Sequence, residues 1–134
     1  MHWSIYPCLA AAVTLVGACA TVPPRDPVEC SQGACVMLGQ AQQLREFTVT
    51  PIEVLDDSRC PEGVQCVWEG EVRMRVAIAS TNGVAEDEIS TRSPVPVNRG
   101  MLQLAEVTPA PSADSAFDPG AYRFRFRWVP DIAQ

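Results

Sequence analysis

The sequence predicts a small all-β domain, an antiparallel sandwich or barrel of five to six strands, preceded by a disordered N-terminal tether. Three observations lead to this prediction. Apolar and polar residues alternate with a period of two in several short runs after residue 45. Pro, Gly and Asn residues separate these runs, as they do between short strands. The chain lacks the helical patterns that would supply the crossovers of a parallel sheet, which disfavours a doubly wound fold.

The first strand signals lie at the start of the expected domain. Phe47 and Val49 alternate with polar residues, and Ile52 and Val54 alternate in the opposite register. Pro51 stands between the two pairs, and because proline inside a strand is confined to edges and bulges, we expect a β-bulge there. The next run is a half-buried strand whose inward positions are Val72, Met74, Val76 and Ile78.

A tight hairpin is expected next. Asn82-Gly83 is a dipeptide preferred in two-residue hairpin turns, because both positions tolerate a positive φ. The returning strand covers residues 84–91, and its Glu86-Asp87-Glu88 sequence indicates an exposed edge of the sheet. Further strands are expected over residues 101–107 and 121–129, separated by a loop rich in Pro, Ala, Ser and Asp.

The last expected strand has two faces of opposite character. Its apolar positions are Tyr122, Phe124, Phe126 and Trp128, and its polar positions are Arg123, Arg125 and Arg127. Unpaired arginines would form a basic stripe for lipopolysaccharide phosphates, an acidic glycan or an envelope protein, because guanidinium groups bind phosphates and carboxylates through two hydrogen bonds. The alternative is that these arginines pair with carboxylates on the neighbouring strand.

Residues 1–18 are typical of a bacterial lipoprotein signal peptide. The apolar run from Leu9 to Val16 is far shorter than the roughly 20 residues that a membrane-spanning helix needs. Val16-Gly17-Ala18-Cys19 resembles the sequence at which bacterial lipoproteins are cleaved and acylated, so Cys19 is the expected lipidation site. Cleavage after Ala20 is the alternative and would give a soluble secreted protein. Ala20 behind an acylated cysteine resembles the outer-membrane class, so we expect a lipid anchor in the outer membrane, facing the periplasm or the exterior.

Residues 19–45 are expected to be a lipidated, Pro- and Gln-rich tether, followed by the β domain over residues 46–130. The early prolines favour an extended chain, and the pattern allows a short helix over residues 39–45. Cys30 and Cys35 form a close pair within this segment. Redox-active dithiols usually have a C-x-x-C spacing at a helix start, so a structural disulfide is favoured over a thiol-redox couple.

The composition excludes several classes of active site. All ten basic residues are Arg, sixteen residues are acidic, and the formal net charge is −6. The single histidine, His2, lies in the expected signal peptide. The remaining chain therefore lacks the imidazole of Ser-His-Asp, Cys-His and His-containing zinc sites, and the amine of Schiff-base and phosphate-loop lysines. The acidic balance disfavours nucleic acid. We expect no catalytic residues and no cofactor.

The most distinctive local sequence surrounds a second pair of cysteines. Four cysteines beyond Cys19 allow three pairings, and proximity favours Cys30 with Cys35 and Cys60 with Cys66. A Cys60–Cys66 disulfide would close a tight loop between two strands in an oxidising compartment. Trp68 is then expected beside this disulfide as one wall of the core, because buried aromatics dominate small β cores.

The same stretch resembles a signature of small bacterial secreted proteins and lipoproteins. The matching residues are Asp57-Ser58-Arg59-Cys60-Pro61, then Cys66, Trp68 and Gly70, in the pattern D-S-R-C-P-x(4)-C-x-W-x-G. The resemblance covers roughly residues 45–80. It implies a small β domain with this hairpin-like insertion and no particular chemistry.

Metal binding is an alternative for two groups of residues. Calcium prefers carboxylate oxygens, which are clustered at Asp56, Asp57, Glu62, Glu69 and Glu71. EF-hand spacing is missing, and a solvated acidic loop with Arg59 as its counter-ion is the favoured interpretation. Copper(I) prefers sulfur ligands, which the cysteines could supply together with Met37, Met74 or Met101. Because periplasmic cysteine pairs are usually oxidised, we expect no metal site.

The sequence therefore predicts an outer-membrane lipoprotein that acts as a non-catalytic binding or structural module of the cell envelope. Its expected partners are the membrane, through the lipid anchor, and an envelope protein, a glycan or lipopolysaccharide. Two alternatives stay open. One is a periplasmic metal-binding or thiol-redox protein. The other is an inhibitor of a secreted hydrolase, which would present the loop between Cys60 and Cys66 to the enzyme.

Overall fold

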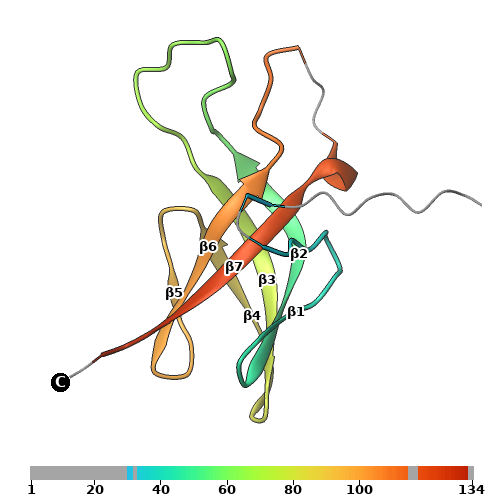
Figure 1. Cartoon of the computed structure of the whole chain (residues 1–134), viewed down its shortest axis with the longest axis vertical. Coiled ribbons are helices and arrows are strands. Elements are labelled where there is room, and N and C mark those ends of the chain that lie inside the picture. The colour runs from blue at the N-terminus through green and yellow to red at the C-terminus, as the bar shows by residue number, and fades with distance from the viewer. Residues whose placement is uncertain (1–29, 32, 115–117, 133–134) are drawn as a thin grey trace, which may run out of the picture.

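The structure, a computed structural model, describes residues 30–31, 33–114 and 118–132, which form two antiparallel β-sheets packed around a common core (Figure 1). One sheet has the order β1 (Gln42–Leu44), β2 (Phe47–Asp57), β3 (Val72–Ser80) and β4 (Gly83–Ser90). The other has the order β5 (Val95–Pro96), β6 (Gly100–Thr108) and β7 (Arg123–Pro130). The predicted all-β sandwich is confirmed, with two very short strands, β1 and β5, beyond those expected.

Several predictions lie outside the described residues. These are the signal peptide, Cys19 and the first part of the tether. Within the part of the chain that the structure describes, no helix is long and apolar enough to cross a membrane.

The core is built from alternate residues of strands in both sheets. Its largest fully buried side chains are Phe124, Phe126, Met74, Ile89 and Leu102. The alternation predicted for β3 and β7 is confirmed, since Arg73 and Arg75 of β3 are exposed while their neighbours along the strand are buried. Ile78 and Trp128 pack at the rim of this core and are partly buried.

The bulge and the hairpin also form, with one change. The pairing of β2 with β3 shifts between Pro51 and Glu53, as predicted, and again between Val54 and Asp56. In the β3–β4 hairpin, Ser80 pairs with Gly83, so the two turn residues are Thr81 and Asn82. The prediction that Asn82-Gly83 forms the turn was one residue late, because the positive φ of 114° falls on Gly83, the first residue of β4.

The β4 strand is an exposed edge, as predicted. Its residues from Gly83 to Glu88 are exposed, and the acidic Glu86-Asp87-Glu88 sequence lies in this stretch. Charged side chains on an edge strand oppose pairing with a second copy of the same edge. The acidic sequence therefore protects the edge of the four-stranded sheet.

The segment before β2 covers the opposite edge of the sandwich. Val36 exchanges main-chain hydrogen bonds of 2.9 and 2.8 Å with Phe124 of β7. The side-chain amide of Gln42 donates to the Phe126 carbonyl and accepts from the Phe126 N–H, both at 3.0 Å. The short helix that the pattern allows over residues 39–45 does not form, because pairing to β2 and β7 holds this segment extended. The packed part of the chain therefore begins before residue 46.

Candidate functional site

The connection between β2 and β3, residues 58–71, projects from one end of the sandwich, and we call it the disulfide loop (Figure 1, green loop at the top). Its ends are joined, since the Ser58 N–H donates to the Glu71 carbonyl at 2.9 Å and the Glu71 N–H donates to Ser58 Oγ at 3.1 Å. A disulfide between Cys60 and Cys66 closes its middle. The loop therefore leaves the domain on a narrow, cross-linked neck.

Gly70 is required for this neck. A Cβ atom at Gly70 would overlap the main-chain carbonyl of Ser58. The two segments of the neck approach each other so closely that no side chain fits at position 70. This gives the glycine of the signature a packing role.

Arg59 fixes the base of the disulfide loop. Its Nε and Nη2 donate to the two Asp57 carboxylate oxygens at 2.8 and 2.7 Å, which confirms the predicted role of Arg59 as a counter-ion. Its Nη1 and Nη2 also donate to the carbonyls of Val107 and Pro109 at 2.8 and 3.0 Å. Because these carbonyls belong to the end of β6 and the residues after it, Arg59 ties the loop to the second sheet.

Asp57 also binds Tyr122. The Tyr122 hydroxyl donates to Asp57 Oδ2 at 2.6 Å. Burial disfavours a charged Asp57 carboxylate, but hydrogen bonds from Arg59 and Tyr122 outweigh this effect and hold its pKa below the usual value. Burial, together with the hydrogen bond to Asp57, raises the pKa of Tyr122 to about 12. Asp57 is therefore charged and Tyr122 neutral at physiological pH.

The tip of the disulfide loop is apolar and open to solvent. The exposed fractions of the residues Val64, Val67 and Trp68 are 47%, 93% and 76%. The prediction that Trp68 forms a wall of the core was wrong. The two sheets already fill the core with aromatic residues from β7, and the loop lies beyond their ends. Exposed Val and Trp side chains on a fixed loop are typical of a binding surface.

Acidic residues flank this apolar tip along the chain. Within the described ranges, no ion pair involves the side chains of Glu62, Glu69 or Glu71. Nor do three or more His, Cys, Asp or Glu side chains of the described residues converge as metal ligands. The disulfide loop therefore carries exposed apolar residues and acidic residues in one short segment.

The sulfur atoms considered for copper are separated in the fold. Cys30 and Cys35 form a disulfide, as predicted by their proximity, and so do Cys60 and Cys66. Met74 lies in the core, while Met37 is exposed. Because both cysteine pairs form disulfides, we interpret the role of the cysteines as structural.

The arginine stripe on β7 is largely engaged. Arg125 pairs with Glu106 of β6 at 3.3 Å, as the alternative interpretation expected. Arg127 donates to the Gln103 side chain at 2.6 Å, and Arg123 donates to the Gly120 and Tyr122 carbonyls at 2.9 and 2.8 Å. The stripe therefore offers fewer free donors than the sequence suggests.

Glu106 also holds the N-terminal part of the described chain. Its carboxylate accepts from the main-chain N–H and the hydroxyl of Ser31, both at 2.9 Å. Hydrogen bonds from the Ser31 main chain, from the Ser31 hydroxyl and from Arg125 lower the pKa of Glu106. Arg125 is thus part of a contact between Ser31 and β6.

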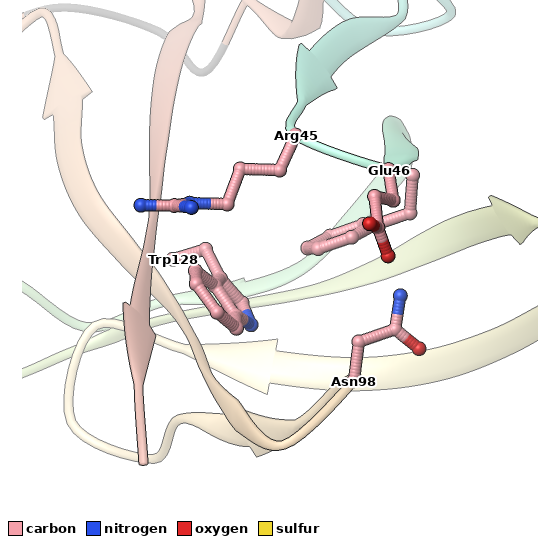
Figure 2. Close-up of a pocket in the computed structure, with 5 residues that line it drawn as sticks. Arg45, Glu46, Asn98 and Trp128 are labelled. Carbon is pink, nitrogen blue, oxygen red and sulfur yellow. The ribbon is translucent and has the colours of Figure 1, made fainter. Parts of the chain in front are cut away.

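A second candidate site lies at the other end of the sandwich. Five residues line a hollow of about 150 Å³, namely Arg45, Glu46, Phe47, Asn98 and Trp128 (Figure 2). Sequence reasoning missed this site because its residues come from three separate segments. Arg45 lies in the two-residue turn between β1 and β2, and Asn98 and Arg99 form the turn between β5 and β6. Their positive φ values of 51°, 47° and 57° are those of tight hairpin turns.

Comparisons with known proteins add no further constraint. The chain matches no protein-family model, no curated protein and no solved structure in these comparisons. The resemblance around Cys60 and Cys66 therefore stays a prediction. The geometry of the disulfide loop and of the hollow remains as the basis for a function.

Proposed function

We propose that this protein is a lipid-anchored protein of the bacterial envelope that binds a protein partner through its disulfide loop, without catalysing a reaction. The observation that supports this most directly is the exposure of Val67 and Trp68 on a loop with a fixed base. A preorganised loop loses little conformational entropy on binding. Tryptophan is also among the residues that contribute most to binding energy in protein interfaces.

The charge around the tip defines the chemistry of the partner. Glu62 and Glu69 flank the exposed apolar residues in the sequence. A complementary surface would have an apolar pocket for Trp68 and a rim of Lys or Arg residues. Such complementarity accelerates association and excludes acidic partners.

The sequence and the disulfides support the envelope location and the non-catalytic role. Two disulfides favour an oxidising compartment. Cys19 follows a signal-peptide sequence and is the expected acylation site. Lys is missing from the chain, and the single His precedes Cys19, which removes the commonest catalytic bases and nucleophilic amines.

Intact mass of the protein extracted from native membranes tests the location. We expect a chain that begins at an acylated Cys19 and whose other four cysteines react with an alkylating reagent only after reduction. A Cys19→Ser variant should lose the acyl mass and leave the membrane fraction. A chain that begins at Thr21, without lipid, would contradict the anchor.

Photocrosslinking in intact cells tests the binding surface. A photoreactive amino acid is placed at Trp68 or, as a control, at Val84, an exposed apolar residue on the β3–β4 hairpin at the other end of the sheet. We expect a discrete protein adduct from position 68 and none from position 84. The purified partner should then bind Trp68→Ala at least tenfold more weakly than Val84→Ala. Equal affinities of the two variants would contradict the proposal.

Inhibition of a secreted hydrolase is the second candidate function. The loop between Cys60 and Cys66 is closed by a disulfide and projects from the domain, as a substrate-like inhibitory loop would. In that case substitutions over residues 62–65 should abolish inhibition of the enzyme and leave the fold intact. If the crosslinked partner is a hydrolase whose activity falls on binding, the inhibitor function is favoured.

A further inference from the structure

The hollow at the end opposite the disulfide loop combines one aromatic wall with three polar groups. Figure 2 shows the Arg45 side chain extended over Trp128, while Glu46 and Asn98 face each other across the remaining space. The Arg45 guanidinium carbon lies 5.0 Å from the centre of the Trp128 ring. The indole N–H of Trp128 donates to the Val97 carbonyl at 2.8 Å, which fixes the orientation of the ring.

The polar groups around this ring are available to a ligand. In residues 30–31, 33–114 and 118–132, no hydrogen bond or ion pair involves the Arg45 guanidinium, the Glu46 carboxylate or the Asn98 amide. Together they offer both donors and acceptors. Arg45 and Asn98 lie in the tight turns of two hairpins, β1–β2 and β5–β6, which fix the positions of their backbones.

Size and charge narrow the class of ligand. At about 150 Å³, the hollow is smaller than the pockets of drug-sized molecules and has room for one ring. One Arg and one Glu give its wall no net charge, which disfavours an anion such as phosphate. The cation site on Trp128 is already taken by Arg45. A neutral molecule with one apolar face and several hydroxyl groups fits best.

From this arrangement we infer that the hollow binds one neutral pyranose unit of a saccharide. The weakly positive C–H groups of a pyranose pack on the negative face of an aromatic ring, and here they would lie beside Arg45 on the Trp128 ring. Its hydroxyl groups donate to the Glu46 carboxylate and to the Asn98 oxygen, and accept from the Asn98 amide and the Arg45 guanidinium. This inference goes beyond the proposed function, since it concerns another ligand at the opposite end of the domain.

Titration of the acylated protein with simple sugars tests the inference. The Trp68→Phe variant, in a detergent without sugar headgroups, leaves Trp128 as the one tryptophan after residue 18. The probes are N-acetylglucosamine and methyl glucoside, with glycine and inorganic phosphate as comparisons. The NMR signal of the Trp128 indole N–H reports binding. We expect a saturable shift with a sugar, with a Kd of about 1 mM because few hydrogen bonds are made.

Two variants and one control assign the binding to this hollow. Glu46→Gln removes the charge at constant shape, and Asn98→Gly removes the amide at a position where glycine accepts the positive φ. Each should raise the Kd about fivefold, the loss expected for one hydrogen bond. Glu86→Gln removes a charge from exposed β4 and should leave the Kd unchanged. Thermal unfolding of each variant checks that the fold is retained.

Three outcomes would overturn the inference. The first is that neither sugar gives a saturable shift in the millimolar range. The second is that phosphate or glycine binds and the sugars do not, which would indicate an ionic site. The third is that Glu46→Gln and Asn98→Gly bind sugar as tightly as the Glu86→Gln control. A preference for N-acetylglucosamine over methyl glucoside, or the reverse, supports the inference and indicates which envelope glycan supplies the ring.

Discussion

The hydroxyl of Tyr122 donates a hydrogen bond of 2.6 Å to Asp57, which links the end of one sheet to the start of a strand in the other. Asp57 is the last residue of β2, and Tyr122 directly precedes β7. Arg59 binds the same carboxylate and continues to carbonyls at the end of β6. This cluster of Asp57, Arg59 and Tyr122 therefore joins the two sheets at the base of the disulfide loop.

Tyr122 should resist ionisation. After residue 18 it is the only tyrosine of the chain, so the phenolate absorbance of protein that begins at Cys19 reports Tyr122 alone. We expect this absorbance to appear near pH 12 in the folded protein and near pH 10 after unfolding. Because the folded pKa is raised, the stabilisation is complete below pH 10 and is lost as the pH rises through 12. Titration of the folded protein near pH 10 would contradict the hydrogen bond.

Asp57 should make the fold sensitive to acid. Its pKa is lowered in the folded state, so its stabilisation is present above the unfolded value of 3.8 and is lost as the pH falls below it. We expect Asp57→Asn to lower the free energy of unfolding at neutral pH by about 3 kcal/mol, because Arg59 loses its partner. Urea unfolding at several pH values measures this. Glu53→Gln breaks the exposed ion pair with Arg75 and should cost about 0.5 kcal/mol or less.

Gly70 and Gly63 should respond differently to alanine. Both lie in the disulfide loop, but a Cβ at Gly63 meets open space, although its φ is 77°. We expect Gly63→Ala to cost about 1 kcal/mol through backbone strain. Gly70→Ala should cost clearly more, because the Ser58 main chain must move. Equal shifts of the melting temperature would argue against the narrow neck.

Trp68 should contribute little to stability. Removal of an exposed side chain changes the free energy of unfolding by about 0.5 kcal/mol or less, so Trp68→Ala should unfold like the native protein. Phe126→Ala, in the core, should cost about 3 to 5 kcal/mol. Urea unfolding of both variants gives the comparison, and a large loss for Trp68→Ala would place this side chain in the core after all.

The strands were predictable where one face of a strand is buried. The alternation in β3 and β7 follows directly from burial against the opposite sheet. Strand β1 was not predictable, because Gln42 joins β7 through its polar side chain and leaves no apolar pattern. The disulfide loop was only partly predictable, and the hollow beside Trp128 was not predictable because its residues come from three separate segments. The cysteine spacing identified the disulfide loop, but whether Trp68 points into the core depends on how the aromatic residues of β7 fill it.

The main-chain pairing of Val36 with Phe124 has a mechanical consequence. Phe124 stacks on Tyr122, with ring centres 5.7 Å apart, and Tyr122 binds Asp57 at the base of the disulfide loop. If the proposed lipid anchor holds the N-terminus and the proposed partner holds the loop tip, tension between them would follow this short route along one end of the sandwich. The parts of the strands farther from this end would carry little of the tension. The hollow beside Trp128, at the far end, would keep its shape while the protein is pulled.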